Sequence, residues 1–166
     1  MDQAPPRIVW TADRQHSQIL VEMRQGGCSL CPVSDARPPY VYTIGLSLTC
    51  QHPELLVSAP VEVGLAMLGQ AVQAVRGGVR LTPGPLYRLR RTDTTPVQFA
   101  PVRTGLTRYL HLACAVLHTQ SFAALQLLYT DEAGCWPWDP FCNPTISQAQ
   151  RRWCTVPRPP YMGEYL

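Results

Sequence analysis

Apolar and polar residues follow two different periods along the chain, and the order of these periods predicts helices mixed with strands. Apolar residues recur every three or four positions in stretches that predict helices over residues 12–25, 60–76 and 106–118. The second stretch has the clearest apolar stripe, which consists of Val61, Leu65, Leu68, Val72 and Val75. Glycine pairs at 26–27 and 77–78 are natural ends for the first two helices. One or two further helical turns are expected over 146–153.

Shorter runs rich in β-branched and aromatic residues predict strands between these helices. The expected strands cover residues 28–33, 40–47, 54–58, 79–82, 86–91, 97–102 and 122–130. The mixed order predicts a single α+β domain over residues 1–166, with a twisted, mostly antiparallel sheet of about six strands. We expect two or three helices to cover one face of this sheet. The proline-rich segment 155–166 is expected to form an extended C-terminal tail.

Composition supports a folded domain of ordinary size. The chain has 166 residues, of which 46% are hydrophobic and 15% charged, so it can bury a core and is not typical of disordered proteins. No apolar run approaches the ~20 residues of a membrane span, and the first residues lack the pattern of a secretory signal. We therefore expect a cytoplasmic protein whose seven cysteines are thiols rather than a disulfide framework.

The positive charge is carried by arginine alone and is concentrated in the middle of the chain. Seven arginines lie between Arg76 and Arg108, and Asp93 is the only acidic residue among them. Arg88 and Arg90 share one face of a predicted strand and are candidates for binding phosphates, including those of a nucleic acid. No nucleic-acid motif accompanies them, and a solvated sheet face is the commoner explanation.

An alternating trio supplies the most suggestive catalytic pattern. In an extended segment Cys50, His52 and Glu54 would project to one side, as a nucleophile, a base and an orienting carboxylate would. Catalytic groups this close in sequence are uncommon, and the alternative is that His52 and the following proline shape a turn. We retain His52 and Glu54 as catalytic candidates, with Asp131 as a third candidate.

Two groups of cysteine and histidine have the chemistry of metal ligands. His111, Cys114 and His118 are spaced i, i+3 and i+7, so a continuous helix would place them in one arc that could bind zinc or copper. An ordinary half-exposed helix face explains the same spacing. Cys28 and Cys31, with Cys50 and His52, have the residue types of a zinc site, but a strand would point the first two to opposite faces. No resident cofactor is expected otherwise.

A tryptophan pair follows the last predicted strand. Trp136 and Trp138 flank a proline, just after a turn that begins at Asp131. Two such side chains can line a pocket or an interface, or can close the open end of a sheet. Together with Tyr42 they are the aromatic candidates for binding.

Two motifs carry a resemblance to a known family. The segments are Tyr42-Thr43-Ile44-Gly45-Leu46 with His52-Pro53-Glu54-Leu55-Leu56, and the downstream run from Leu125 to Asp131 with Trp136-Pro137-Trp138. Together they resemble the bacterial and phage proteins of domain-of-unknown-function family 4262. The resemblance implies a fold but no activity. It places His52, Glu54, Asp131, Trp136 and Trp138 on motif positions. The expected architecture also resembles, more distantly, the suppressor-of-fused superfamily. That superfamily includes immunity proteins that neutralise toxins.

These observations favour a non-enzymatic protein-binding module in defence, immunity or regulation. The alternative is a small hydrolase or transferase with a His/Glu site. A third hypothesis is a metal-dependent form of such an enzyme. The sequence has no P-loop, GxGxxG, GxSxG or HExxH motif, so the best-marked enzyme classes are excluded.

Overall fold

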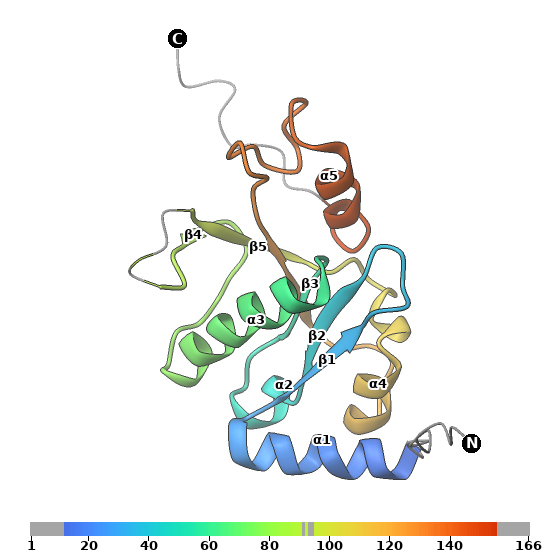
Figure 1. The fold of residues 1–166 in the computed structure, drawn as a ribbon. Helices are drawn as coiled ribbons and strands as arrows, with labels where there is room; N and C mark the ends of the chain where they lie inside the picture. Colours follow the sequence, from blue (N-terminus) through green and yellow to red (C-terminus); the bar gives the residue numbers. More distant parts are fainter. Residues whose placement is uncertain (1–11, 91, 93–94, 156–166) are drawn as a thin grey trace, which may run out of the picture.

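A computed structural model describes residues 12–90, 92 and 95–155 of the chain. Six strands form one sheet in the order β1-β2-β3-β6-β5-β4, and helices pack around it (Figure 1). The strands are β1 (Ser29–Val33), β2 (Tyr40–Ile44), β3 (Glu54–Val57), β4 (Leu86–Tyr87), β5 (Val97–Pro101) and β6 (Ala124–Leu128). The helices are α1 (Ala12–Gly26), α2 (Leu46–Thr49), α3 (Val61–Arg76), the 3₁₀ turn η1 (Thr107–Tyr109), α4 (His111–Leu117) and α5 (Pro144–Arg151). The predicted α+β fold with a mostly antiparallel sheet is confirmed.

The last strand enters the middle of the sheet. β1, β2 and β3 form an antiparallel meander, and β6 then pairs parallel to β3, with Leu56 opposite Gln126. β5 and β4 complete the other side by antiparallel pairing. Because β3 and β6 run in the same direction, their carboxyl ends lie at the same edge of the sheet.

The first layer of the core lies between α3 and the sheet. Leu68, Ala71, Val72 and Val75 of α3 are buried there against residues of the central strands. The helix approaches β2 closely at Gly64, where a Cβ atom would lie 2.8 Å from Val41 Cγ2. A glycine is therefore needed at that point of the helix for α3 to pack directly on the sheet.

The second layer covers the opposite face. Ile19 and Met23 of α1 and Val116 of α4 pack with Tyr42 and Leu56 on that side. In Figure 1, α1 and α4 lie together at the lower end of the molecule, and α5 lies at the upper end. Helices thus cover both faces and not one as expected, because every position of β2 and β6 is buried and each face needs a cover.

Several predicted elements are shorter in the structure than in the sequence analysis. Residues 79–82 form no strand, and the strand expected over 86–91 is limited to Leu86 and Tyr87. The helix expected over 106–118 is broken at Leu110, whose φ and ψ are −86° and 68°. Leu110 is fully buried, so its packing overrides the helical periodicity. The predicted tail lies outside the described residues from 156 onward, as does Arg91.

None of the helices in the described ranges is long and apolar enough to cross a membrane. All seven cysteines are free thiols.

Candidate functional site

Glu54 lies in the interior at the start of β3 and is fully buried. One oxygen of its carboxylate accepts hydrogen bonds from the Gly45 amide at 3.0 Å, the Ser47 amide at 3.1 Å and the Ser47 hydroxyl at 2.8 Å. The other accepts from the Thr43 hydroxyl at 2.7 Å and from the Leu46 amide at 3.3 Å. Five donors from one short segment surround this carboxylate. Its arrangement is that of a structural acceptor that holds the turn between β2 and α2.

The turn held by Glu54 requires glycine. Gly45 has a φ of 113°, which favours glycine, and a Cβ atom there would lie 2.7 Å from Met23 Cγ. The positive φ ends β2 and starts the short helix α2, which is why the strand predicted to reach Ser47 stops at Ile44. Gly45, Thr43 and Glu54 therefore act together to fix one backbone corner.

His52 is buried in the same region, and both of its ring nitrogens are occupied. The Leu81 amide donates to Nε2 at 3.1 Å, so Nε2 carries no proton, and Nδ1 donates to the Pro53 carbonyl at 2.8 Å. The ring anchors the segment that follows α3, which explains why residues 79–82 do not pair as a strand. No nitrogen of this ring is available to a substrate.

The structure does not bring the three catalytic candidates together. Glu54, at the start of β3, is the register partner of Ala124 at the start of β6. Asp131 lies seven residues after Ala124, beyond the other end of β6. At the rise of a strand, Asp131 is therefore roughly 20 Å from Glu54. Cys50, His52 and Glu54 also do not alternate along an extended segment, because Cys50 caps α2 and Gln51 has a φ of 52°. The geometry for a shared catalytic site is not present in this region.

Asp131 also has a structural role. Its carboxylate accepts from the amides of Ala133 at 3.0 Å, Cys135 at 2.9 Å and Asn143 at 2.8 Å. These bonds, that from Asn143 first, lower the pKa of the carboxyl group below its ordinary value. Asp131 thereby closes a loop that runs to Asn143, and we call residues 131–143 the aromatic loop.

The three metal candidates of the third predicted helix do not share an arc. α4 begins at His111, and His118 follows its end in a left-handed conformation with a φ of 54°, which turns this residue out of the helical register. The Cys114 thiol lies 3.4 Å from the Thr107 carbonyl, to which it donates. Among the described residues no group of three or more His, Cys, Asp or Glu side chains is placed to hold a metal ion.

Cys28 and Cys31 lie on opposite sides of the sheet, as the geometry of a strand requires. Cys28 packs in the layer under α3, and Cys31 packs in the layer under α1 and α4. Burial raises the pKa of the Cys28 thiol to about 12 and also raises that of Cys31. Both are protonated packing residues rather than ligands of one site.

The aromatic loop holds the tryptophan pair. The rings of Trp136 and Trp138 stack with centroids 5.0 Å apart and planes 2° from parallel, and both are half-buried against Leu128 and Cys154. The loop is tied to α5, because the Pro137 carbonyl accepts from the Ser147 hydroxyl at 2.6 Å and from Arg151 Nη2 at 2.9 Å. Within the loop, Phe141 is 87% exposed.

Phe141 is the functional candidate that the sequence analysis missed. Its amide donates to the Asp139 carboxylate at 2.9 Å, and the Cys142 amide donates to the Asp139 carbonyl at 3.0 Å, so the backbone on both sides of the ring is held. A single phenylalanine in a loop gives no periodic signal. Only the tertiary structure shows that this ring faces solvent while its backbone is fixed.

The remaining binding candidates differ in exposure. Tyr42 is 2% exposed, and burial raises the pKa of its hydroxyl, so it belongs to the core. Arg88 is exposed and lies beyond the end of β4. With the Gln70 amide turned so that its oxygen faces Arg90, two guanidinium nitrogens of Arg90 donate to that oxygen at 3.0 Å each, which ties this segment to α3. Arg88 and Arg90 therefore do not form the predicted strand face.

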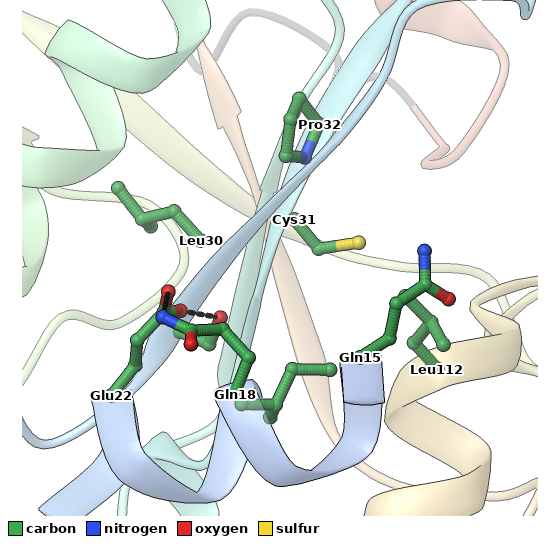
Figure 2. A pocket seen from close by; sticks show the side chains of 9 residues that line it. Gln15, Gln18, Glu22, Leu30, Cys31, Pro32 and Leu112 are labelled. Atoms are coloured by element: carbon green, nitrogen blue, oxygen red, sulfur yellow. Dashed lines mark hydrogen bonds between the residues drawn. The ribbon is translucent and has the colours of Figure 1, made fainter. Parts of the chain in front are cut away.

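A shallow groove lies beside the edge strand β1 (Figure 2). It has a volume of about 340 Å³ and is formed by α1, β1 and Leu112 of α4. The Glu22 carboxylate in this groove accepts hydrogen bonds from the Gln18 side-chain amide at 3.0 Å and from the Ser29 hydroxyl. Figure 2 shows the Cys31 thiol directed toward the side formed by Gln15 and Leu112. Because burial raises the pKa of Cys31 and Glu22 already has two donors, this groove offers no activated nucleophile.

Comparison with known proteins gives one match. A family model described as a domain of unknown function, DUF4262, matches residues 22–143. The matched range runs from the end of α1 to the end of the aromatic loop, so it includes the corner held by Glu54. No curated protein and no solved structure matches the chain.

Proposed function

The chain belongs to the DUF4262 family, and from that premise we propose that it is a non-enzymatic module that binds a protein partner through the aromatic loop. The observation that carries the proposal is Phe141, which presents an 87% exposed ring on a backbone held by hydrogen bonds. Aromatic residues, phenylalanine included, are enriched in the buried cores of protein interfaces relative to the rest of the surface. A role in defence, immunity or regulation is the setting we propose for such a module.

Rigidity of the loop supports this proposal. Asp131 joins the two ends of the loop through the Asn143 amide, and α5 holds the Pro137 carbonyl. The stacked Trp136 and Trp138 pack against Leu128 and Cys154, which anchors the loop on the sheet. A loop that is ordered before binding loses little conformational entropy when a partner docks, so more of the contact energy contributes to affinity.

The internal use of the catalytic candidates supports the same proposal. His52 and Glu54 are bonded within the protein through every polar atom of their side chains, and both lie far from Asp131. A general base must reach its substrate within hydrogen-bond distance. The motif around these residues is better explained by the backbone corner it forms than by a reaction.

The proposal is tested by partner capture with matched variants. Tag-immobilised wild type, Phe141→Ser and Leu86→Ser are exposed to lysate of the source organism, and the retained proteins are quantified by mass spectrometry. Leu86 is 60% exposed on the edge strand β4, so its substitution controls for the loss of one exposed apolar side chain. We expect one protein to be retained by wild type and Leu86→Ser and lost with Phe141→Ser.

The captured protein is then purified and its affinity measured by calorimetry. Truncation of an aromatic residue at the centre of an interface costs about 2 kcal/mol, or roughly 30-fold in Kd. Retention that is equal for all three forms, or an affinity that Phe141→Ser leaves unchanged, contradicts the proposal.

A further inference from the structure

A crevice lies at the carboxyl ends of the two parallel strands, away from the β1 groove. After β3 the chain continues into α3 on one face of the sheet, and after β6 it continues through the aromatic loop into α5. α5 belongs to the opposite face, because the Gln126 side chain of that face donates to the Gln150 carbonyl at 2.7 Å. In open sheets, ligands bind where neighbouring parallel strands send their connections to opposite faces.

The crevice has the size and rigidity of a ligand site. Its volume is about 460 Å³, within the range of small-molecule pockets. Pro38, Pro60, Met67 and Ile146 give it apolar walls from the β1–β2 connection, the start of α3 and α5. The Tyr129 hydroxyl donates to the Ser58 carbonyl at 2.8 Å, which fixes a further wall.

Buried polar atoms without partners occur at several places in the fold. In the described part of the chain, four buried side-chain atoms have no hydrogen-bond partner: Ser58 Oγ, Gln126 Oε1, Thr130 Oγ1 and Trp153 Nε1. Thr130 lines the crevice, and Ser58, which is fully buried, directly precedes the lining residue Ala59. Buried polar groups are normally bonded by protein or by ordered water, and because these two oxygens are closed off from solvent they do not face the open space of the crevice. A ligand in the crevice would therefore be held by the shape and the charge of the crevice.

The charge of the crevice has one sign. Asp131 and Glu132 lie at its rim, and none of its lining residues is Arg, Lys or His. The backbone bonds to Asp131 lower the pKa of that carboxyl group, which keeps it ionised at neutral pH. No described residue forms an ion pair or hydrogen bond with Glu132 through its side chain, so its carboxylate can receive a cation.

We propose that this crevice binds a small organic cation with an apolar body. The body packs against Pro60, Met67 and Ile146, and its ammonium group donates to the Glu132 carboxylate. The site is independent of the exposed ring of Phe141, which does not line the crevice. A protein partner for the aromatic loop is therefore not required for this ligand to bind.

Three probes of similar shape and different charge test the proposal. Phenethylamine, 2-phenylethanol and 3-phenylpropanoate carry a phenyl ring with a cationic, neutral or anionic end. Binding is followed by amide shifts in ¹⁵N-labelled protein at moderate salt. We expect phenethylamine to shift the amides of Val63, Thr130 and Glu132, with a Kd at least about 10-fold lower than that of 3-phenylpropanoate.

Matched variants locate the site. Val63 lines the crevice and is 44% exposed, whereas Val79 is 45% exposed and lies outside it. Val63→Trp is expected to abolish phenethylamine binding, and Val79→Trp is expected to leave it unchanged. Glu132→Gln is expected to retain the shifts and to reduce the preference for the amine about 5-fold. Equal affinity for the three probes, shifts in another region, or binding that survives Val63→Trp overturns the proposal.

Discussion

The Thr43 hydroxyl donates a hydrogen bond to the Glu54 carboxylate at 2.7 Å and accepts one from the Leu55 amide at 2.8 Å. One hydroxyl therefore links the end of β2 to the start of β3 and to the carboxylate that holds the corner between them. Thr43 and Glu54 lie eleven positions apart, in the two neighbouring segments of the first family motif. Their spacing is explained by this contact, and no substrate is needed to account for it.

Replacing His52 is expected to release the segment after α3. In His52→Leu the Leu81 amide, which is buried, loses its acceptor, and an unpartnered buried amide costs about 1–3 kcal/mol. We expect hydrogen exchange at the Leu81 amide to accelerate at least about 10-fold in native protein. The Val72 amide in α3 serves as the internal control. Unchanged exchange at Leu81 would show that the histidine does not anchor this segment.

The stabilising effect of Asp131 is expected to depend on pH. The pKa of its carboxyl group is lower in the folded protein than in the unfolded chain, where it is about 3.9. Such a group stabilises the fold fully above the unfolded value, and the effect is lost as the pH falls through the folded pKa. Wild type is thus expected to exceed Asp131→Asn in free energy of unfolding at pH 7, and the two should converge toward pH 3.

Urea unfolding at pH 7, 5, 4 and 3 measures this convergence. Because Asp131 binds the backbone of the aromatic loop, amide shifts in Asp131→Asn should be largest within residues 131–143. A difference in stability that stays constant to pH 3 contradicts an effect of the ionised carboxylate.

Buried thiols are expected to resist alkylation in the native protein. Burial raises the pKa of Cys28 to about 12 and that of Cys154 to about 11, so neither is appreciably ionised at pH 8. Iodoacetamide should modify both only after unfolding in urea, as peptide mass spectrometry would show. Rapid labelling of Cys28 in native protein would mean that the start of β1 opens readily.

Periodicity predicted the two longest helices and the first three strands of the sheet. α1 and α3 follow from apolar stripes ended by glycines, and β1, β2 and β3 follow from short apolar runs with turns between them. The parallel insertion of β6 beside β3 has no local signal, because pairing depends on which edge the earlier strands leave open. The break at Leu110 has none either, since it results from burial of that residue.

The candidate site was predictable only in part. The sequence indicated the tryptophan pair and the importance of His52 and Glu54, but it assigned the latter two a chemistry that their contacts do not support. Alternation along an extended segment requires regular backbone, and the positive φ of Gln51 ends that regularity. The exposure of Phe141 and the crevice at the ends of β3 and β6 arise from elements distant in sequence.

The most direct test of the structural role of the motif is the free energy of unfolding of Glu54→Gln. The side-chain NH₂ group of glutamine would face the backbone N–H of Gly45, Leu46 or Ser47, so that two donors oppose each other. We therefore expect the free energy of unfolding, measured in urea at pH 7, to fall by about 3 kcal/mol. Asp35→Asn, in the exposed β1–β2 connection, is the matched control and should change stability by less than about 0.5 kcal/mol. If Glu54→Gln unfolds with the wild-type free energy, the carboxylate does not hold the corner, and a catalytic role for Glu54 becomes the better explanation.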